Sequence, residues 1–170
     1  MNTSVLLESW IWFGIAAVGF AVLFNVPKRT LLPIFLMAAL GGTLKLILVQ
    51  NTENVVLGTL CGAVLVGFLS IYAAHLRHSP PFVFAIPSVI PMVPGSFAYH
   101  TMKGVIKLSG HVNALEFNSL LRETVNSGLK TLFILLAISI GVFAPMLITR
   151  RNSAKEINIR IPVLKSKRKS

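Results

Sequence analysis

The sequence contains no aspartate, and its five acidic residues are all glutamates. This absence excludes the aspartate pairs on which aspartic proteases and many two-metal enzymes depend. The single cysteine, Cys61, excludes an intramolecular disulfide. Only 12% of the 170 residues are charged, whereas a typical soluble domain has about 25%. The composition therefore favours lipid over water as the surroundings of this chain.

Hydrophobic residues make up 54% of the chain, and the mean hydropathy is +0.76. They gather in runs of the length that an α-helix needs to cross a bilayer, about 20 residues. These runs are residues 9–27, 30–49, 54–74, 82–102 and 131–149. The pattern predicts an all-α, polytopic membrane bundle of about five transmembrane helices, formed by residues 1–149 as one domain.

Basic residues are concentrated at the C-terminal end. The formal net charge is +11, and eight of the sixteen Lys and Arg residues follow Thr149. Because cytoplasmic segments beside membrane helices carry an excess of Lys and Arg, we expect residues 150–170 to form a disordered cytoplasmic tail near the lipid. Nucleic-acid binding is not expected, since no aromatic residues alternate with these charges. Five crossings then put the N-terminus outside.

The segment between the fourth and fifth runs, about residues 103–130, fits this orientation poorly. Lys103 and Lys107 would face outward, against the usual distribution of basic residues. Four crossings with a re-entrant fourth run would bring them inside, but would also move the basic tail outside, so we prefer five. Phe117, Leu121 and Val125 recur at helical spacing and predict a short amphipathic helix at the membrane surface, with a solvated loop as the alternative.

The fourth run contains three prolines at spacings of four and three, Pro87, Pro91 and Pro94, and Gly95 follows the last of them. A proline inside a helix removes a backbone hydrogen bond and costs roughly 3 kcal/mol. The spacing predicts a helix that is discontinuous at Pro91, Pro94 and Gly95. In hydrocarbon, backbone groups freed in this way need partners, and broken helices are tolerated mainly around cavities. A kinked helix that serves only packing is the alternative.

This break is the candidate substrate pathway. Pro94 suits the first turn of a second half-helix, whose free N–H groups at Gly95 and Ser96 would attract a carboxylate. Further polar atoms come from three hydroxyl side chains, those of Ser88, Ser96 and Tyr99. Lys45 is the only charge within a predicted span. It is either a counter-ion for a substrate carboxylate or a side chain that extends to the headgroups.

Two other constellations are weaker. His75 and His78 have a spacing that suits a metal ion, but no cysteine or carboxylate lies near them, so neither a metal nor another cofactor is predicted. Ser96 and His100 would share one helix face, yet no third residue is recognisable that would orient the histidine for hydrolysis. We therefore do not expect an enzyme.

Small residues recur four positions apart in the second and third runs. The pairs are Ala38 with Gly42 and Gly58 with Gly62, and Ala63 and Gly67 follow the second pair. Such spacing lets membrane helices approach one another closely. These residues predict helix packing and no chemistry.

Two segments resemble the threonine/serine exporter family (ThrE type). They are Phe24-Asn25-Val26-Pro27-Lys28-Arg29, and Ile86-Pro87 followed by Ile90-Pro91-Met92-Val93-Pro94-Gly95-Ser96 with Tyr99. Over about residues 19–145 the chain is similar to the family's short, single-module subunit, the YjjB-like type. The residues that match the first-loop motif are Asn25, Pro27 and Arg29. Those that match the motif of the fourth run are Pro91, Pro94, Gly95, Ser96 and Tyr99.

The resemblance implies an exporter of small carboxylated metabolites in the bacterial inner membrane, either threonine and serine or succinate-like dicarboxylates. It also implies a larger membrane subunit of the same family that carries the other half. No predicted span contains a carboxylate, so a proton relay would need His100 or this partner. A membrane scaffold that transports nothing is the alternative function.

Overall fold

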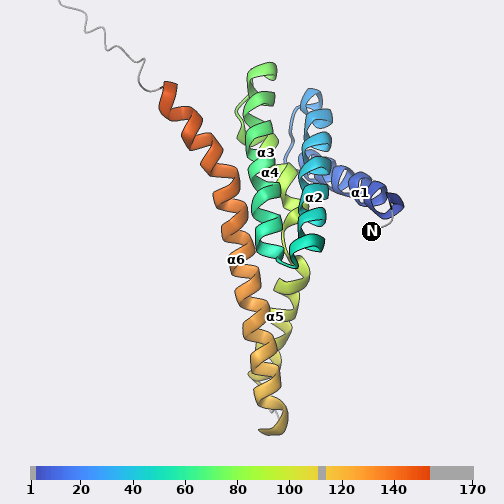
Figure 1. The fold of residues 1–170 in the computed structure, drawn as a ribbon, viewed down its shortest axis with the longest axis vertical. Coiled ribbons are helices and arrows are strands. Elements are labelled where there is room, and N and C mark those ends of the chain that lie inside the picture. Colours follow the sequence, from blue (N-terminus) through green and yellow to red (C-terminus); the bar gives the residue numbers. More distant parts are fainter. Residues whose placement is uncertain (1–2, 111–113, 154–170) are drawn as a thin grey trace, which may run out of the picture.

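A computed structural model describes residues 3–110 and 114–153, and within these ranges all regular structure is helical (Figure 1). The elements, in chain order, are α1 (Thr3–Leu23), η1 (Lys28–Thr30), α2 (Leu31–Thr52), α3 (Val55–Arg77), α4 (Phe82–Val89), η2 (Ile90–Met92), α5 (Gly95–Leu108) and α6 (Ala114–Ser153). The predicted all-α bundle is confirmed.

Four of the described helices, α1, α2, α3 and α6, are long and apolar enough to cross a membrane. A fifth crossing results if α4, η2 and α5 are counted as one span, which is bent by 59° at its break. The helix pattern therefore agrees with the prediction of about five spans, of which the fourth is discontinuous.

Helix α1 begins at Thr3, earlier than the predicted run, so the exposed Glu8 lies within a candidate span. The expectation that no span contains a carboxylate is therefore wrong for the first helix. One glutamate near a helix end does not interrupt the backbone hydrogen bonds, and an exposed side chain there can point towards the headgroups.

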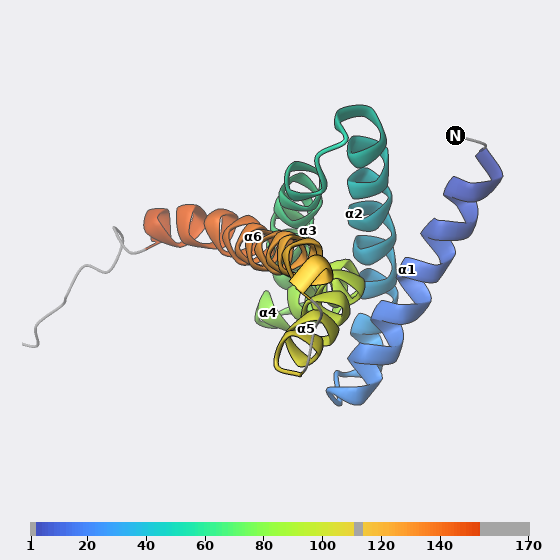
Figure 2. The same cartoon turned by 90° about the horizontal axis from the view of Figure 1, so that it is seen from below.

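Helices α2 and α3 pack closely because both expose glycine at their contact. A Cβ atom added to Gly62 would lie 2.6 Å from the backbone oxygen of Gly41. On its other side α3 contacts α6 in the same way, since a Cβ atom on Gly141 would lie 2.7 Å from Cβ of Ala63. The predicted role of Gly62 and Ala63 in helix packing is confirmed. Figure 2 shows α1 on the side of α2 that faces away from α6.

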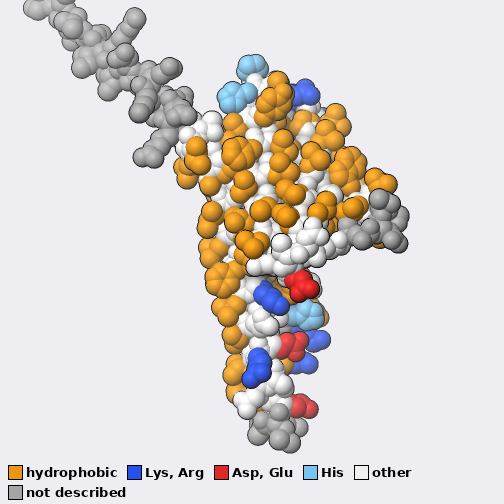
Figure 3. Space-filling view, viewed as in Figure 1, with side chains coloured by type: hydrophobic (Ala, Val, Ile, Leu, Met, Phe, Trp, Pro, Cys, Tyr) orange, Lys and Arg blue, Asp and Glu red, His pale blue; other side chains and the backbone are white. Residues whose placement is uncertain are grey.

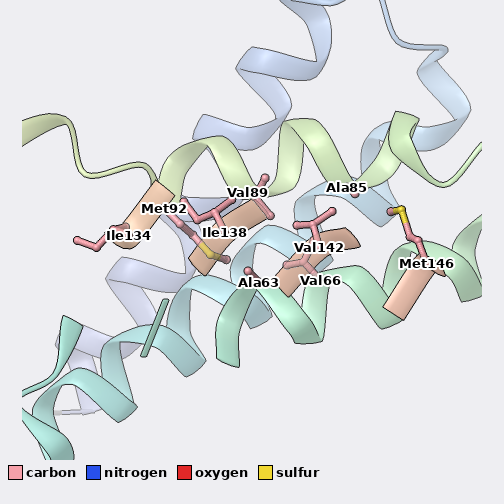
Figure 4. Close-up of a cluster of buried hydrophobic side chains, with 9 residues drawn as sticks. All are labelled: Ala63, Val66, Ala85, Val89, Met92, Ile134, Ile138, Val142 and Met146. Atoms are coloured by element: carbon pink, nitrogen blue, oxygen red, sulfur yellow. The ribbon is translucent and has the colours of Figure 1, made fainter. Parts of the chain in front are cut away.

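One of the two hydrophobic core clusters among the described residues joins α3, α4, η2 and α6, and the other joins α1, α2, α3 and α4. The first cluster contains the break. It consists of the buried side chains of Ala63, Val66, Ala85, Val89, Met92, Ile134, Ile138, Val142 and Met146 (Figure 4). Because Ala85, Val89 and Met92 belong to it, the chain from α4 to the end of η2 lies inside the bundle. The break that follows Met92 is therefore anchored on its N-terminal side by packing.

Helix α6 has 40 residues, which corresponds to about 60 Å, or about twice the hydrocarbon thickness of a bilayer. Its C-terminal half packs on α3. Its N-terminal part, residues 114–130, packs on α5 instead, where Thr124 leaves no room for a side chain at Gly104. We call α5 and residues 114–130 the α5–α6 hairpin, and Figure 1 shows that it projects beyond the bundle.

The hairpin corrects one expectation about residues 103–130. The expected helix that leads into the last span is present, since residues 114–130 continue into that span without a break, but Lys103 and Lys107 belong to α5 and not to this helix or a loop. The charged side chains in this part of α6 do not stop the helix, since Glu, Arg and Lys are good helix formers.

Candidate functional site

The loop after α1 is a tight helix-ending turn. Asn25 has a positive φ of 54°, the N–H of Asn25 donates to the carbonyl of Val22, and the N–H of Val26 donates to that of Ala21, both at 3.0 Å. These two bonds form a Schellman-type helix end, in which asparagine tolerates the left-handed conformation. The carbonyl of Pro27 then accepts the hydroxyl of the buried Thr30 at 2.7 Å. Asn25 and Pro27 thus shape the turn.

The break in the fourth span extends over a few residues. After η2 the chain becomes extended at Val93, which has φ −60° and ψ 136°, and Pro94 precedes the first turn of α5. The N–H of Val93 donates to the carbonyl of Ile90 at 3.0 Å, and that of Gly95 donates to the carbonyl of Val93 at 2.9 Å. The prediction of a discontinuity at Pro91, Pro94 and Gly95 is confirmed.

Lys45 provides the partner that the break requires. In a continuous α-helix the carbonyl of Met92 would accept the N–H of Ser96. At the break it accepts Nζ of Lys45 instead, at 2.8 Å. Lys45 is half-buried, and its aliphatic part lies against α3 near Gly62. The side chain therefore holds α2 to the break, an arrangement that neither sequence interpretation of Lys45 had included.

The other predicted pathway residues lie on two sides of the break. Gly95, Ser96 and Tyr99 are exposed on α5. Ser88 is fully buried on α4, and its hydroxyl is directed into the protein: it lies 2.7 Å from the carbonyl of Phe84 and 3.3 Å from that of Ile34 on α2. Between Ser88 on α4 and the exposed residues on α5, Pro94 is buried and Pro91 is half-buried. The structure thus brings Lys45 to the break but keeps the Ser88 hydroxyl among the helices.

A small polar groove lies on the α5–α6 hairpin, beyond the first turn of α5. Its volume is about 170 Å³, and its polar lining comes from His100, Lys103 and Lys107 on α5 and from Glu123 and Thr124 on α6. Sequence reasoning missed this groove. The spacing of three and four between the three basic side chains was the available signal, because it predicts one common helix face.

The alternative chemical sites gain no support. Ser96 and His100 are both exposed on α5. Nδ1 of His75 lies 2.8 Å from the carbonyl of Ile71 within the same helix. Among the described residues no three His, Cys, Asp or Glu side chains lie close enough to hold a metal ion.

These features define a multi-pass helical membrane protein with one broken span, an architecture found among secondary transporters. The chain belongs to the family described as Threonine/Serine exporter, ThrE, which matches residues 9–148. The printed description of the family is that of an exporter, and the long apolar helices of the chain agree with a multi-pass membrane protein.

One relative is an uncharacterized protein of Haemophilus influenzae, which is 32% identical over 146 residues. The match covers 86% of this chain but 48% of that protein, so the chain spans about half the length of the relative. No solved structure is significantly similar to the chain.

Proposed function

We propose that this protein is the small subunit of a two-subunit exporter for small carboxylated metabolites, either threonine and serine or succinate-like dicarboxylates. It acts as a transporter without chemical catalysis and without a cofactor. The observation that carries the proposal is the broken span, in which the chain leaves the helix at Val93 and Pro94 and the carbonyl of Met92 accepts Nζ of Lys45. Irregular backbone at membrane depth is tolerated mainly where it lines a pathway.

The break offers two kinds of hydrogen-bond donor to a carboxylate. Pro94 provides no side-chain hydrogen bond to cap α5, so the first N–H groups of that helix, at Ser96 and the residue after it, remain for a ligand. The ammonium group of Lys45 has three donors and gives one to the Met92 carbonyl. A carboxylate that passes the break can therefore accept hydrogen bonds from Lys45 and from the first N–H groups of α5. The charges of the carboxylate and of Lys45 then both have partners.

The polar groove supports a small substrate. Its volume of about 170 Å³ is below the range of about 300–1,000 Å³ that is usual for drug-sized ligands. Lys103 and Lys107 suit a carboxylate, and Glu123 suits an ammonium group such as that of an amino acid. We propose that the groove forms one end of the pathway, with Tyr99 beside its entrance.

Two observations, the length of the relative and an exposed hydrophobic surface, support the proposal of a larger subunit. The chain covers only 48% of its relative, so the relative contains about the same length again. In addition, the exposed hydrophobic residues Leu121, Val125 and Leu129 continue along α6 below the level of the bundle (Figure 3). A helix of about 60 Å extends past a hydrocarbon layer of about 30 Å, so lipid tails do not cover this surface. A membrane subunit of the same family would cover this surface.

The efflux of threonine, serine and succinate tests the function directly. Cells that lack the gene should export at least one of the three more slowly, and re-expression of the gene should restore the rate only in cells that also contain the larger subunit. Unchanged efflux of all three would favour the scaffold alternative. The Pro94→Leu variant should insert normally but export slowly, because it allows α4 and α5 to form one helix. Normal export by this variant would show that the substrate pathway does not pass through the break.

The orientation is a separate proposal: a location in the bacterial inner membrane, with the C-terminus cytoplasmic and the N-terminus outside. The α2–α3 turn lies at the end of the bundle from which the hairpin projects, and the α3–α4 turn lies at the opposite end (Figure 1). In a Cys61→Ser background, a membrane-impermeant maleimide should label Ser109→Cys in intact cells, and His78→Cys only after permeabilisation. The reverse labelling pattern would show that the N-terminus is cytoplasmic and the C-terminus outside.

A further inference from the structure

Helix α5 has one face that packs on α6 and an opposite face that is exposed. The residues of α5 that contact α6 lie at spacings of four and three and are Phe97, Thr101 and Gly104. About half a turn away lie three large side chains that are each between 60% and 64% exposed, those of Tyr99, Met102 and Ile106. We call these three residues the outer face of α5. Because α6 occupies the other side of the helix, the outer face is the side that is open to a partner.

Two lysines flank the outer face. Lys103 and Lys107 line a shallow groove of about 230 Å³ together with its three residues, and they also line the polar groove of the hairpin, where Glu123 lies. Neither lysine forms an ion pair with a described residue. Helix α5 contains no Asp or Glu, whereas residues 114–130 of α6 contain side chains of both signs. Figure 3 shows that Lys and Arg side chains gather on the hairpin, below the hydrophobic surface of the bundle.

The outer face begins at the level of the membrane surface. Helices α2 and α3 have 22 and 23 residues, or about 33–35 Å, which matches a hydrocarbon thickness of about 30 Å. The turn between them therefore marks one boundary of the hydrocarbon layer. Figure 1 shows that α5 begins near the level of this turn. From Tyr99 to Lys103 the helix rises by about 6 Å, and the headgroup layer on one side of a bilayer is about 5–8 Å thick.

We propose that the outer face of α5 binds the anionic phospholipid headgroups at this membrane surface, with Lys103 and Lys107 at the phosphates. Tyrosine and lysine are typical of the headgroup layer, because each combines an apolar part with a polar end. Lysine is also attracted to an anionic lipid surface. The contact would hold α5 from the side opposite α6. The proposal does not depend on the transported substrate.

A protein is a poorer occupant of the outer face than lipid. Lysine is depleted at protein–protein interfaces, and the two lysines here lie beside a groove of only about 230 Å³. The exposed apolar row of α6, Leu121, Val125 and Leu129, has acidic and basic residues around it and suits the larger subunit better. The two helices of the hairpin would therefore have different partners.

Fluorescence of the full-length chain in vesicles of phosphatidylglycerol and phosphatidylcholine tests the position of the outer face. In a Cys61→Ser background, Met102→Cys and Ser109→Cys each carry a polarity-sensitive label. Phosphatidylglycerol with a nitroxide on the upper part of its acyl chain should quench the label at position 102. It should not quench the label at position 109, which lies about 10 Å further along the helix. Equal quenching at the two positions, or none at position 102, would overturn the proposal.

A matched pair of variants tests the charge. Lys103 and Arg122 are both exposed, but only Lys103 lines the groove. They lie at similar levels of the hairpin, since Gly104 packs against Thr124. In native mass spectrometry, Lys103→Gln should lower the ratio of bound phosphatidylglycerol to phosphatidylcholine about five-fold, which corresponds to about 1 kcal/mol, and Arg122→Gln should leave the ratio unchanged. Equal effects of the two changes, or none from Lys103→Gln, would overturn the proposal.

Other occupants of the outer face give different results. Protection of the label at position 102 by the co-expressed larger subunit, or a ready disulfide between two copies that carry Met102→Cys, would show a protein occupant and overturn the proposal. Loss of the preference for phosphatidylglycerol in excess inorganic phosphate would show a site for free anions and overturn it as well. Circular dichroism verifies that each variant folds, and Lys107→Gln replaces Lys103→Gln if the latter does not.

Discussion

Replacing Gly62 by alanine tests whether the close contact of α2 and α3 holds Lys45 at the break. A Cβ atom at this position would lie 2.6 Å from the carbonyl oxygen of Gly41 and 3.3 Å from Cβ of Lys45. The first of these atoms belongs to the backbone, so the clash cannot be relieved by a side-chain rotation and the helices must separate. Lys45 would then move away from the Met92 carbonyl.

The expected magnitude follows from two opposing contributions. Overpacking of a close contact costs about 1–3 kcal/mol, and alanine regains about 0.5–1 kcal/mol because it is a better helix former than glycine. With the middle value of each range, we expect a net loss of about 1 kcal/mol in the free energy of unfolding. For a chain of this size the loss corresponds to a fall in Tm of roughly 2–5 °C.

The assay is thermal unfolding of the purified protein in detergent, followed by circular dichroism, together with efflux from cells. Gly19→Ala on α1 is the matched control, because no atom lies within 4 Å of the added Cβ, so its Tm should not fall. If the two variants melt at the same temperature, the tight α2–α3 contact does not determine stability. If Gly62→Ala melts early but exports normally, the position of Lys45 does not depend on this contact.

Three further changes test other contacts. Lys45→Met removes the donor to the Met92 carbonyl, a loss of about 1–3 kcal/mol; efflux should fall about tenfold, and Lys45→Arg should retain part of it. Asn54→Ala removes the cap that accepts two N–H groups in the first turn of α3, which should cost about 1 kcal/mol and speed hydrogen exchange there. Gly104→Leu should separate α5 from α6 and accelerate proteolysis of the hairpin, whereas Gly95→Ala, with no atom within 4 Å, should not.

The sequence is sufficient to predict the spans, because a bilayer requires long apolar runs whatever the packing. It is also sufficient to predict the break, since Pro91 and Pro94 restrict the backbone locally and the adjacent Gly95 is a poor helix former. Helix ends are less predictable. Glu53 and His78 both end helices in the left-handed conformation, with φ of 55° and 48°, and neither is a residue type that strongly signals such an end.

The contact between Lys45 and Met92 could not be predicted from the sequence. The two residues are 47 positions apart, and their approach depends on how closely α2 and α3 pack and on where α4 enters the bundle. A lysine in an apolar run indicates only that the charge needs a partner. The packing of α5 against residues 114–130 could not be predicted from the sequence either. It depends on the contact of Gly104 with Thr124, and the sequence around each of these residues gives no sign of its partner.

The continuity of α6 has a mechanical consequence. Because one continuous helix contacts α5 near one end and α3 near the other, a force on the hairpin is transmitted along about 40 Å of helix to the contact of Gly141 with Ala63. The link between η2 and α5 at Val93 and Pro94, in contrast, has no regular helical structure and acts as a joint. A partner that pulls on the hairpin would therefore turn α5 about this joint while Met92 stays fixed in the core, and the rotation would change the distance from Lys45 to the first turn of α5.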